Sequence, residues 1–272
     1  MDKKKRLKEK IKEYGKEDIC VAFSGGVDSS LLLKLACDAA LPNGKKVYAV
    51  TFDTKLHPAC DLENAKKVVE EIGGIHEIIE IDELEQKEIQ NNPINRCYLC
   101  KYHLFGKLRE FADTKKIEII LDGTNEEDLY QYRPGIKALQ ELNIISPLKD
   151  AKMTKREVKE MAAEYGISVA FRPSTPCMAT RLPYGEKLDY DILKRIEKGE
   201  EYLRDFIGGN IRLRIHKDIA RIEVDSENFS EVLEKKEEIV KNLKKYGFFY
   251  ICLDLEGFRS GSMDIDLKKK GY

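Results

Sequence analysis

The stretch Ser24–Ser30, which reads Ser-Gly-Gly-Val-Asp-Ser-Ser, constrains the fold of this chain more than any other part of the sequence. It follows an apolar run at residues 19–23 and opens into the apolar residues 31–36, an order that predicts a strand, a glycine turn and a helix. Glycines let a backbone approach a ligand closely, and the first N–H groups of a helix attract an anion. A serine-capped turn would account for any one of these residues, but the whole stretch predicts a phosphate-binding loop of Ser24, Gly25, Gly26, Asp28, Ser29 and Ser30.

Strand-like and helix-like segments alternate through the first 150 residues. Strands are expected at residues 19–23, 46–52, 76–81, 117–121 and 144–145, and helices at 60–72, from 101 to about 115, and at 136–142. Such alternation predicts an α/β fold with a doubly wound parallel sheet, whose ligands bind beyond the carboxyl ends of the strands. The glycine loop, Thr51 and the turn of Asp122, Gly123 and Thr124 fall at those ends, which predicts one nucleotide pocket.

The last hundred residues have a different character. A capping box of Thr154 and Glu157 begins one more helix, and we place the end of the first domain at residue 170. An irregular loop with three prolines follows at 172–185. Beyond it we expect a helix at 190–206, strands at 211–215, 220–224 and 248–253, and a charged helix at 227–246. Residues 1–170 and 171–272 are therefore predicted to form a nucleotide-binding domain and a smaller α+β domain.

The charge balance and the lack of long apolar segments argue against two classes of partner, nucleic acids and membranes. The chain of 272 residues has 48 lysines and arginines against 49 aspartates and glutamates, which argues against a strongly basic nucleic-acid binder. No stretch reaches the length of a membrane span, and residues 1–7 lack the apolar region of a signal peptide. We therefore expect a cytoplasmic protein with no membrane partner.

The seven cysteines favour metal or sulfur chemistry over a disulfide framework. Cys20, Cys37 and Cys252 lie in apolar segments and are expected in the core, and Cys60 fits a core or cap position better than a reactive one. The remaining three, Cys97, Cys100 and Cys177, have arginine, lysine or proline neighbours that favour a thiolate.

The C-x-x-C pair of Cys97 and Cys100 leaves several interpretations open. It could be half of a zinc site, a redox pair, part of an iron–sulfur site, or incidental. A structural zinc ion needs four ligands, and the sequence has no second pair of this kind. Together with Cys177, the pair could hold a [4Fe–4S] cluster that keeps one iron open.

Arg212 and Arg214 stand two residues apart on a predicted strand, so their side chains leave the same face of the sheet. Two guanidinium groups on one face repel each other unless an anion lies between them, and a substrate phosphate or carboxylate would serve. A solvated strand face is the simpler alternative.

The stretch Ser24–Ser30 resembles the PP-loop of the ATP pyrophosphatases, which cleave ATP between its α and β phosphates and adenylate a substrate. It lacks the lysine of a Walker loop. This resemblance implies an adenine nucleotide alpha hydrolase-like fold that binds ATP and Mg²⁺. Asp28 would be a metal partner, or else a helix cap, and the residues from Asp122 to Asn125 resemble the second nucleotide loop of these enzymes.

Three further segments narrow the resemblance. Residues 172–181, the pair Arg212 and Arg214, and residues 254–263 together resemble the LarE family, from about residue 5 to 265. These sulfur transferases help to build the nickel-pincer nucleotide cofactor of lactate racemase. They adenylate a carboxylate of pyridinium-3,5-biscarboxylic acid mononucleotide and convert it to a thiocarboxylate. The resemblance implies a nucleotide-binding role for Arg181 and a metal-binding role for Glu200. Thr180 stands where the family usually has serine, so the hydroxyl is kept.

Members of this family differ in their sulfur source. Some have one cysteine, at the position of Cys177, and give up its sulfur to leave dehydroalanine. Others have three cysteines and resemble [4Fe–4S] enzymes that pass on a cluster-bound sulfide. This chain resembles the second kind, which implies a catalytic Cys177, an external sulfide source and a homo-oligomer such as a hexamer. Two alternatives are a PP-loop tRNA thiolase and a nucleotide-binding or zinc-stabilised module without turnover.

Overall fold

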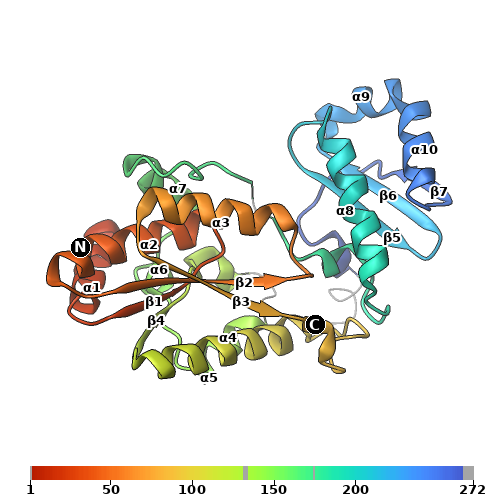
Figure 1. Cartoon of the computed structure of the whole chain (residues 1–272). Helices are drawn as coiled ribbons and strands as arrows, with labels where there is room; N and C mark the ends of the chain where they lie inside the picture. Colours follow the sequence, from red (N-terminus) through yellow and green to blue (C-terminus); the bar gives the residue numbers. More distant parts are fainter. Residues whose placement is uncertain (1, 131–133, 174, 266–272) are drawn as a thin grey trace. The chain divides into compact units, whose positions relative to one another are not determined.

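The computed structural model describes residues 2–130, 134–173 and 175–265. It has two compact units, Met1–Glu83 with Asn95–Ser174, and Leu84–Ile94 with Thr175–Tyr272 (Figure 1). The second unit is therefore discontinuous in sequence. A domain boundary at residue 170 stays a prediction, and each unit is described on its own below. Among the described residues, no helix is long and apolar enough to cross a bilayer.

The first unit is built on a parallel sheet of four strands in the order β3-β2-β1-β4. The strands are β1 (Ile19–Ala22), β2 (Val47–Thr54), β3 (Ile75–Ile81) and β4 (Ile119–Leu121). The α/β fold with a parallel sheet, predicted from the alternating segments, is thus confirmed. The strand expected at residues 144–145 is wrong, because Ile145 makes only an isolated bridge to Leu121. Asn143, at φ 53°, and the helix that begins at Pro147 leave no room for a longer strand.

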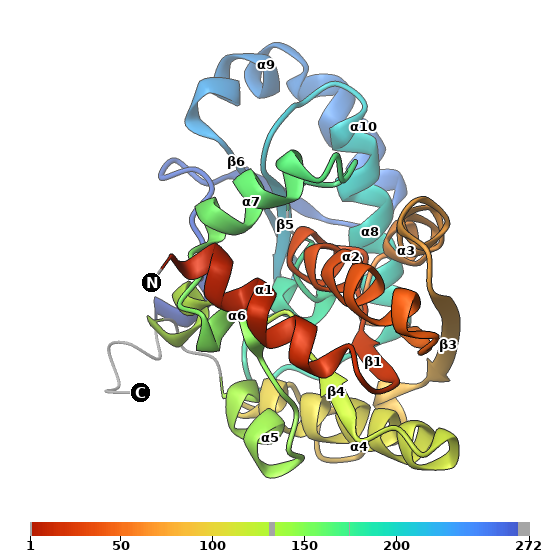
Figure 2. The ribbon, with the colours of Figure 1, turned by 90° about the vertical axis from the view of Figure 1, so that its left-hand side faces the viewer.

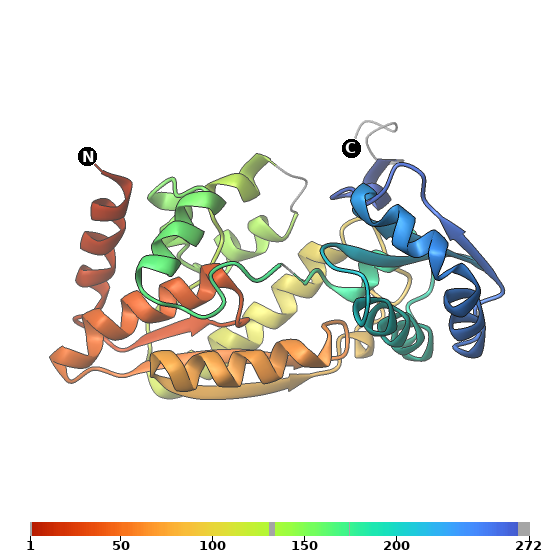
Figure 3. The ribbon, with the colours of Figure 1, turned by 90° about the horizontal axis from the view of Figure 1, so that it is seen from above.

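Helices cover both faces of this sheet (Figure 2). The helices are α1 (Lys3–Tyr14), α2 (Val27–Ala40), α3 (Ala59–Ile72), α4 (Arg96–Lys115), α5 (Gly135–Glu141), α6 (Pro147–Asp150) and α7 (Lys155–Glu164). One core holds the apolar side chains of α1, α2, α3 and α7 with Ile19 and Val21 of β1. A second core holds those of α4 and α5 with Cys20, whose side chain leaves the opposite face of the same strand. Figure 3 shows α2 and α3 beside each other on the first of these faces.

One helix of this unit begins earlier than expected. The sequence placed its start after Lys101, whereas α4 begins at Arg96 and contains both Cys97 and Cys100. No proline or glycine stands between Asn95 and Lys101, so nothing in the backbone prevents the helix from including them. The two cysteines therefore belong to the first turns of a helix and not to a preceding loop.

The second unit contains a three-stranded sheet in the order β5-β6-β7. Its elements are α8 (Tyr190–Arg204), β5 (Ile211–His216), β6 (Ile219–Val224), α9 (Phe229–Glu234), α10 (Lys236–Lys245) and β7 (Tyr250–Leu253). β5 and β6 form an antiparallel hairpin, and β7 lies parallel to β6. The expectation that Cys252 lies in the core is wrong, because β7 is an edge strand and this cysteine is exposed. The single helix expected at 227–246 is wrong, since Lys235 (φ −94°, ψ 11°) separates α9 from α10. Residues 234–238 have no apolar side chain that packing could hold in helical register.

Candidate active site

The glycine loop is closed by hydrogen bonds among its own serines. The Ser24 N–H donates to Ser29 Oγ (3.3 Å), and Ser29 Oγ donates to the Gly26 carbonyl (3.1 Å). Gly26 is the N-cap of α2 and offers no side-chain cap, so the first N–H groups of this helix remain available to an anion. Gly25 has φ +70°, and a Cβ there would lie 2.9 Å from the Ala65 Cα. Only glycine fits this close approach of the loop to α3.

Ser30 is fully buried in the first turn of α2. Its Oγ has no hydrogen-bond partner among the described residues. Leaving a buried hydroxyl unsatisfied costs free energy that a ligand would recover. This hydroxyl is consistent with the predicted phosphate-binding role of the loop.

Asp28, on the same turn, is held by two side chains from distant parts of the chain. Its carboxylate accepts a hydrogen bond from Asn125 Nδ2 (3.1 Å) and contacts the ammonium group of Lys155. Gly123 lies so close that a Cβ there would be 3.1 Å from both the Asp28 Cβ and the Ser29 nitrogen. The structure thus brings the turn from Asp122 to Asn125 against the glycine loop, as the strand-end argument predicted.

Asp122 organises this second turn. Its carboxylate accepts hydrogen bonds from the Thr124 hydroxyl (2.6 Å) and the Ser146 hydroxyl (2.5 Å). Lys101, one residue after the C-x-x-C pair, approaches the same carboxylate at 3.8 Å. Asp122 is only 4% exposed, so water screens its charge little and its attraction to these neighbours is stronger than at the surface.

Thr51 lies beside the end of β1, because the preceding residue, Val50, pairs with Ala22. β2 continues past it to Thr54, so Thr51 is not at the end of its own strand. Its hydroxyl shares a hydrogen bond of 2.9 Å with His76 Nε2. Burial lowers the pKa of His76, which favours the neutral imidazole at this position.

Sequence reasoning missed three polar side chains at these loops, Lys101, Ser146 and Lys155. Signals were present, because Lys101 follows the C-x-x-C pair and Lys155 is the first residue after the N-cap of α7. What the sequence did not show is that Lys155 reaches Asp28 across 127 residues.

Cys97 and Cys100 stand three residues apart on α4, so they share a face of the helix. Cys97 is exposed and Cys100 is half-buried. The Arg96 guanidinium donates to Cys97 Sγ at 3.6 Å.

In the second unit, the cysteine loop is held by a buried ion pair. Arg181 Nε and Nη2 donate to the two carboxylate oxygens of Glu200 at 2.8 and 2.9 Å, and both side chains are at most 1% exposed. Arg181 Nη1 donates to the Pro176 carbonyl (3.0 Å) and, at 3.4 Å, to the Cys177 carbonyl. Arg181 thus connects α8 to the backbone on either side of Cys177.

The carboxylate of Glu200 accepts two further hydrogen bonds, from Arg204 Nη2 and from the Leu213 N–H, both at 2.9 Å. Burial alone would raise the pKa of Glu200, but the hydrogen bonds and charge of Arg181 outweigh it and hold the pKa below its usual range. The metal role predicted for Glu200 stays a prediction, and a metal ion would have to compete with these four donors.

Arg214 and Arg212 leave the same face of β5, but their surroundings differ from the simple expectation. Arg214 Nε donates to buried Glu223 on β6 (3.1 Å), so a carboxylate of the chain itself already balances this charge. Arg214 Nη1 donates to the Thr180 carbonyl (2.7 Å). The guanidinium of Arg212 lies over the ring of Phe258, 5.2 Å from its centre. Burial, and then the charge of Arg181, lowers the pKa of Arg212 to about 10.

Glu223 is the centre of a wider network in which three arginines pair with three carboxylates, the other two being Asp254 and Glu256. It also accepts hydrogen bonds from Arg221 (2.9 Å) and the Ser262 hydroxyl (2.7 Å). Asp254 is paired with Arg221 (3.3 Å) and with Arg259 (3.0 Å). The segment 254–263, which the sequence singled out, thus closes on the arginine-bearing face of the sheet.

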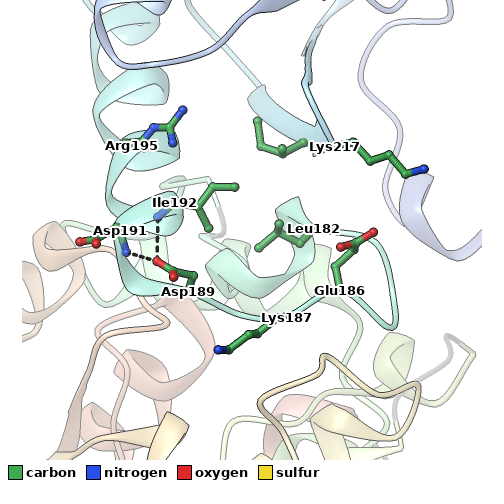
Figure 4. Close-up of a pocket in the computed structure, with 9 residues that line it drawn as sticks. Leu182, Glu186, Lys187, Asp189, Asp191, Ile192, Arg195 and Lys217 are labelled. Atoms are coloured by element: carbon green, nitrogen blue, oxygen red, sulfur yellow. Dashed lines mark hydrogen bonds between the residues drawn. The ribbon is translucent and has the colours of Figure 1, made fainter.

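Among the residues that the structure describes, no three His, Cys, Asp or Glu side chains are grouped as a metal site. Cys97 and Cys100 belong to the first unit and Cys177 to the second, so their joint role stays a prediction. Figure 4 shows a pocket of about 400 Å³ in the second unit, and none of the predicted site residues lines it. It is lined by Leu182, Glu186, Lys187, Asp189, Asp191, Ile192, Arg195, Ile215 and Lys217.

Comparison with known proteins agrees with the architecture of the first unit. Residues 1–100 match the family model of NAD synthase. The chain is 36% identical over 92% of its length to an uncharacterised protein of Synechocystis sp., covering 92% of that protein. It is 35% identical over 94% of its length to an uncharacterised protein of Methanocaldococcus jannaschii, covering 96% of it.

A third relative has a known name. The pyridinium-3,5-bisthiocarboxylic acid mononucleotide synthase of Lactiplantibacillus plantarum is 34% identical over 92% of this chain and 90% of its own length. A match over 92% of the chain includes residues of both units. The chain belongs to the family of PP-loop proteins that includes this synthase.

Proposed function

We propose that the chain is an ATP-dependent sulfur transferase that adenylates a substrate carboxylate and converts it to a thiocarboxylate. The observation that carries the proposal is the hydrogen bonding of Arg181 and Arg214 to backbone carbonyls around Cys177, because buried arginines then support the loop of a candidate sulfur-bearing residue. The name of the Lactiplantibacillus relative supports pyridinium-3,5-biscarboxylic acid mononucleotide as the substrate.

In the first half-reaction, a carboxylate oxygen of the substrate attacks the α-phosphorus of ATP. The bond from this phosphorus to the bridging oxygen breaks, and pyrophosphate leaves with the electron pair. The N–H groups at the start of α2 and the serine hydroxyls would bind the phosphates, and the ammonium groups of Lys101 and Lys155 would offset their charge. Asp28 would hold Mg²⁺, for which its carboxylate is a suitable hard ligand.

In the second half-reaction, a sulfur nucleophile attacks the acyl carbon and AMP leaves, which gives the thiocarboxylate. Adenylation is needed because a free carboxylate is a poor electrophile and AMP is a good leaving group. The buried arginines would bind the anionic groups of the substrate, with Arg212 stacked on Phe258 and Arg214 fixed by Glu223.

The cysteines fit an iron–sulfur cluster by their chemistry. Cys97 and Cys100 share one helix face beside the Arg96 guanidinium, a setting that suits two thiolate ligands, and Cys177 would be the third. A bound [4Fe–4S] cluster with an open iron would supply the sulfide. The protein would hold the Cys177 loop in place through Arg181 and Arg214.

Two measurements test the proposal. Pyrophosphate release from ATP should depend on the dicarboxylate mononucleotide, and its absence with that substrate would exclude the adenylation step. Anaerobically purified protein should contain iron and acid-labile sulfide, and Cys97→Ala should lose both. A colourless, iron-free wild type with full sulfur-transfer activity would refute the proposed iron–sulfur cluster. Loss of one sulfur atom from Cys177 after turnover would indicate the sacrificial route.

A further inference from the structure

Asn92 is a buried polar residue that the proposed chemistry does not use. It is 0% exposed and has φ 46°, a left-handed conformation that asparagine tolerates better than most residues. Its side-chain amide donates to the carbonyls of Pro183 (2.8 Å), Leu182 (3.1 Å) and Ala179 (3.5 Å). One amide thus binds three backbone carbonyls, all within six residues after Cys177.

The backbone at Asn92 and Gln90 also forms hydrogen bonds with the segment that follows Cys177. The Asn92 carbonyl accepts from the Gly185 N–H (3.0 Å), and the Gln90 carbonyl accepts from the Leu188 N–H (2.7 Å). Residues 182–188 form no helix or strand, so their backbone groups need partners from elsewhere. The segment 84–94 supplies them.

Three side chains together hold the loop on both sides of Cys177. Arg181 binds the carbonyls of residues 176 and 177, Arg214 binds that of 180, and Asn92 binds those of 179, 182 and 183. Of the three, only Asn92 comes from the segment inserted between the two parts of the first unit. That segment continues directly into α4, and Cys97 follows Asn92 by five residues.

We propose that Asn92 is a positioning residue for the sulfur-transfer step. By binding the carbonyls of residues 179–183, it fixes the loop that carries Cys177, and it does so from the segment that leads into Cys97 and Cys100. The inference rests on the proposed function, because the position of this loop matters to catalysis only if Cys177 takes part.

The test compares Asn92→Asp with Asn91→Asp. Aspartate has the shape of asparagine, but its ionised carboxylate has no donor and would face three carbonyl oxygens. Asn91 is exposed, so the control introduces the same charge one residue away. In Asn92→Asp we expect hydrogen exchange of peptides within 177–188 to accelerate at least about tenfold, and the control to stay near wild type.

The catalytic readouts separate positioning from general damage. We expect Asn92→Asp to keep pyrophosphate release and the KM for ATP, to lose at least about tenfold in kcat for thiocarboxylate formation, and to change the pH profile of Cys177 alkylation. Equal exchange and equal alkylation in the two variants would overturn the proposal. If Asn92→Asp does not fold, Asn92→Gly keeps the left-handed backbone, removes only the amide and is judged by the same criteria.

The outcome also distinguishes this inference from the proposed function. Exchange and alkylation at Cys177 are measured on the protein without turnover. Suppose that exchange accelerates in Asn92→Asp but the wild type makes no thiocarboxylate. This result would support the role of Asn92 in holding the loop and would refute the role of the loop in sulfur transfer.

Discussion

The ion pair of Arg181 and Glu200 offers the sharpest test of the structure. Glu200→Gln keeps the shape of the side chain but removes its charge and one of its two acceptor oxygens. The carboxylate accepts four hydrogen bonds, two from Arg181, one from Arg204 and one from the Leu213 N–H. Breaking a buried pair by neutralising one partner leaves the other charge uncompensated, so we expect the free energy of unfolding to fall by about 3–5 kcal/mol.

The assay must report on the second unit specifically. The chain has no tryptophan, so urea unfolding is best followed by far-ultraviolet circular dichroism, with hydrogen exchange of α8 and β5 peptides to assign the change. The matched control is Glu201→Gln, because Glu201 is the next residue on the helix and is exposed. A loss below about 1 kcal/mol, the range of surface pairs, would refute the idea that this pair supports the loop.

The same variant has a defined effect on the pH dependence of stability. The pKa of Glu200 is lower in the folded state than in the unfolded state, so the stabilisation from its ionised form is complete above the unfolded value of about 4.3. That stabilisation is lost as the pH falls through the lower, folded value. Glu200→Gln should therefore lose less stability than wild type over this acid range, and parallel acid unfolding curves would contradict the assignment.

Three further predictions concern the first unit and the cysteines. Gly25→Ala should abolish ATP binding in calorimetry, because the added Cβ would meet Ala65. The control is Gly44→Ala, since Gly44 also has a left-handed φ but has open space around it. Equal ATP binding by the two variants would contradict the steric argument. Lys155→Met should slow pyrophosphate release by about 100-fold, because it removes the cation beside Asp28. The control Lys152→Met, at an exposed lysine, should stay near wild type. Unchanged release in Lys155→Met would show that Lys155 takes no part in the reaction. Burial raises the pKa of Cys20 to about 12 and that of Cys37 to about 11, so iodoacetamide at pH 8 should label the exposed Cys60, Cys97 and Cys252 before either of them. Early labelling of Cys20 in peptide mass spectra would contradict its burial.

The sequence was sufficient to predict the layered fold of the first unit, because each apolar run and each glycine break acts locally. The glycine loop and the turn at Asp122 could be placed together for the same reason, since both follow parallel strands. Lys155 could not be placed against Asp28, because its contact with Asp28 spans 127 residues and α7 follows no strand of the sheet directly. Such contacts depend on packing that no local pattern encodes.

One contact could have been anticipated from the sequence. The turn at Lys217 and Asp218 sets the register of the hairpin, which places Arg212 opposite Glu223 and Arg214 opposite Arg221. Directly opposite residues leave the same face, so a carboxylate partner for the two arginines was readable from the spacing. The pattern of one strand shows only the arginine pair, and Glu223 joins it only when β5 and β6 are paired.

The insertion of residues 84–94 into the second unit has a consequence for synthesis of the chain. Asn92 leaves the ribosome 87 residues before Ala179, one of the carbonyls it binds. At common translation rates this is a delay of about 4–17 seconds, during which Asn92 waits for the carbonyls of residues 179–183. The first unit must therefore tolerate an unfinished loop between β3 and α4 while it forms. A chain that ends before residue 175 would carry that unfinished loop permanently.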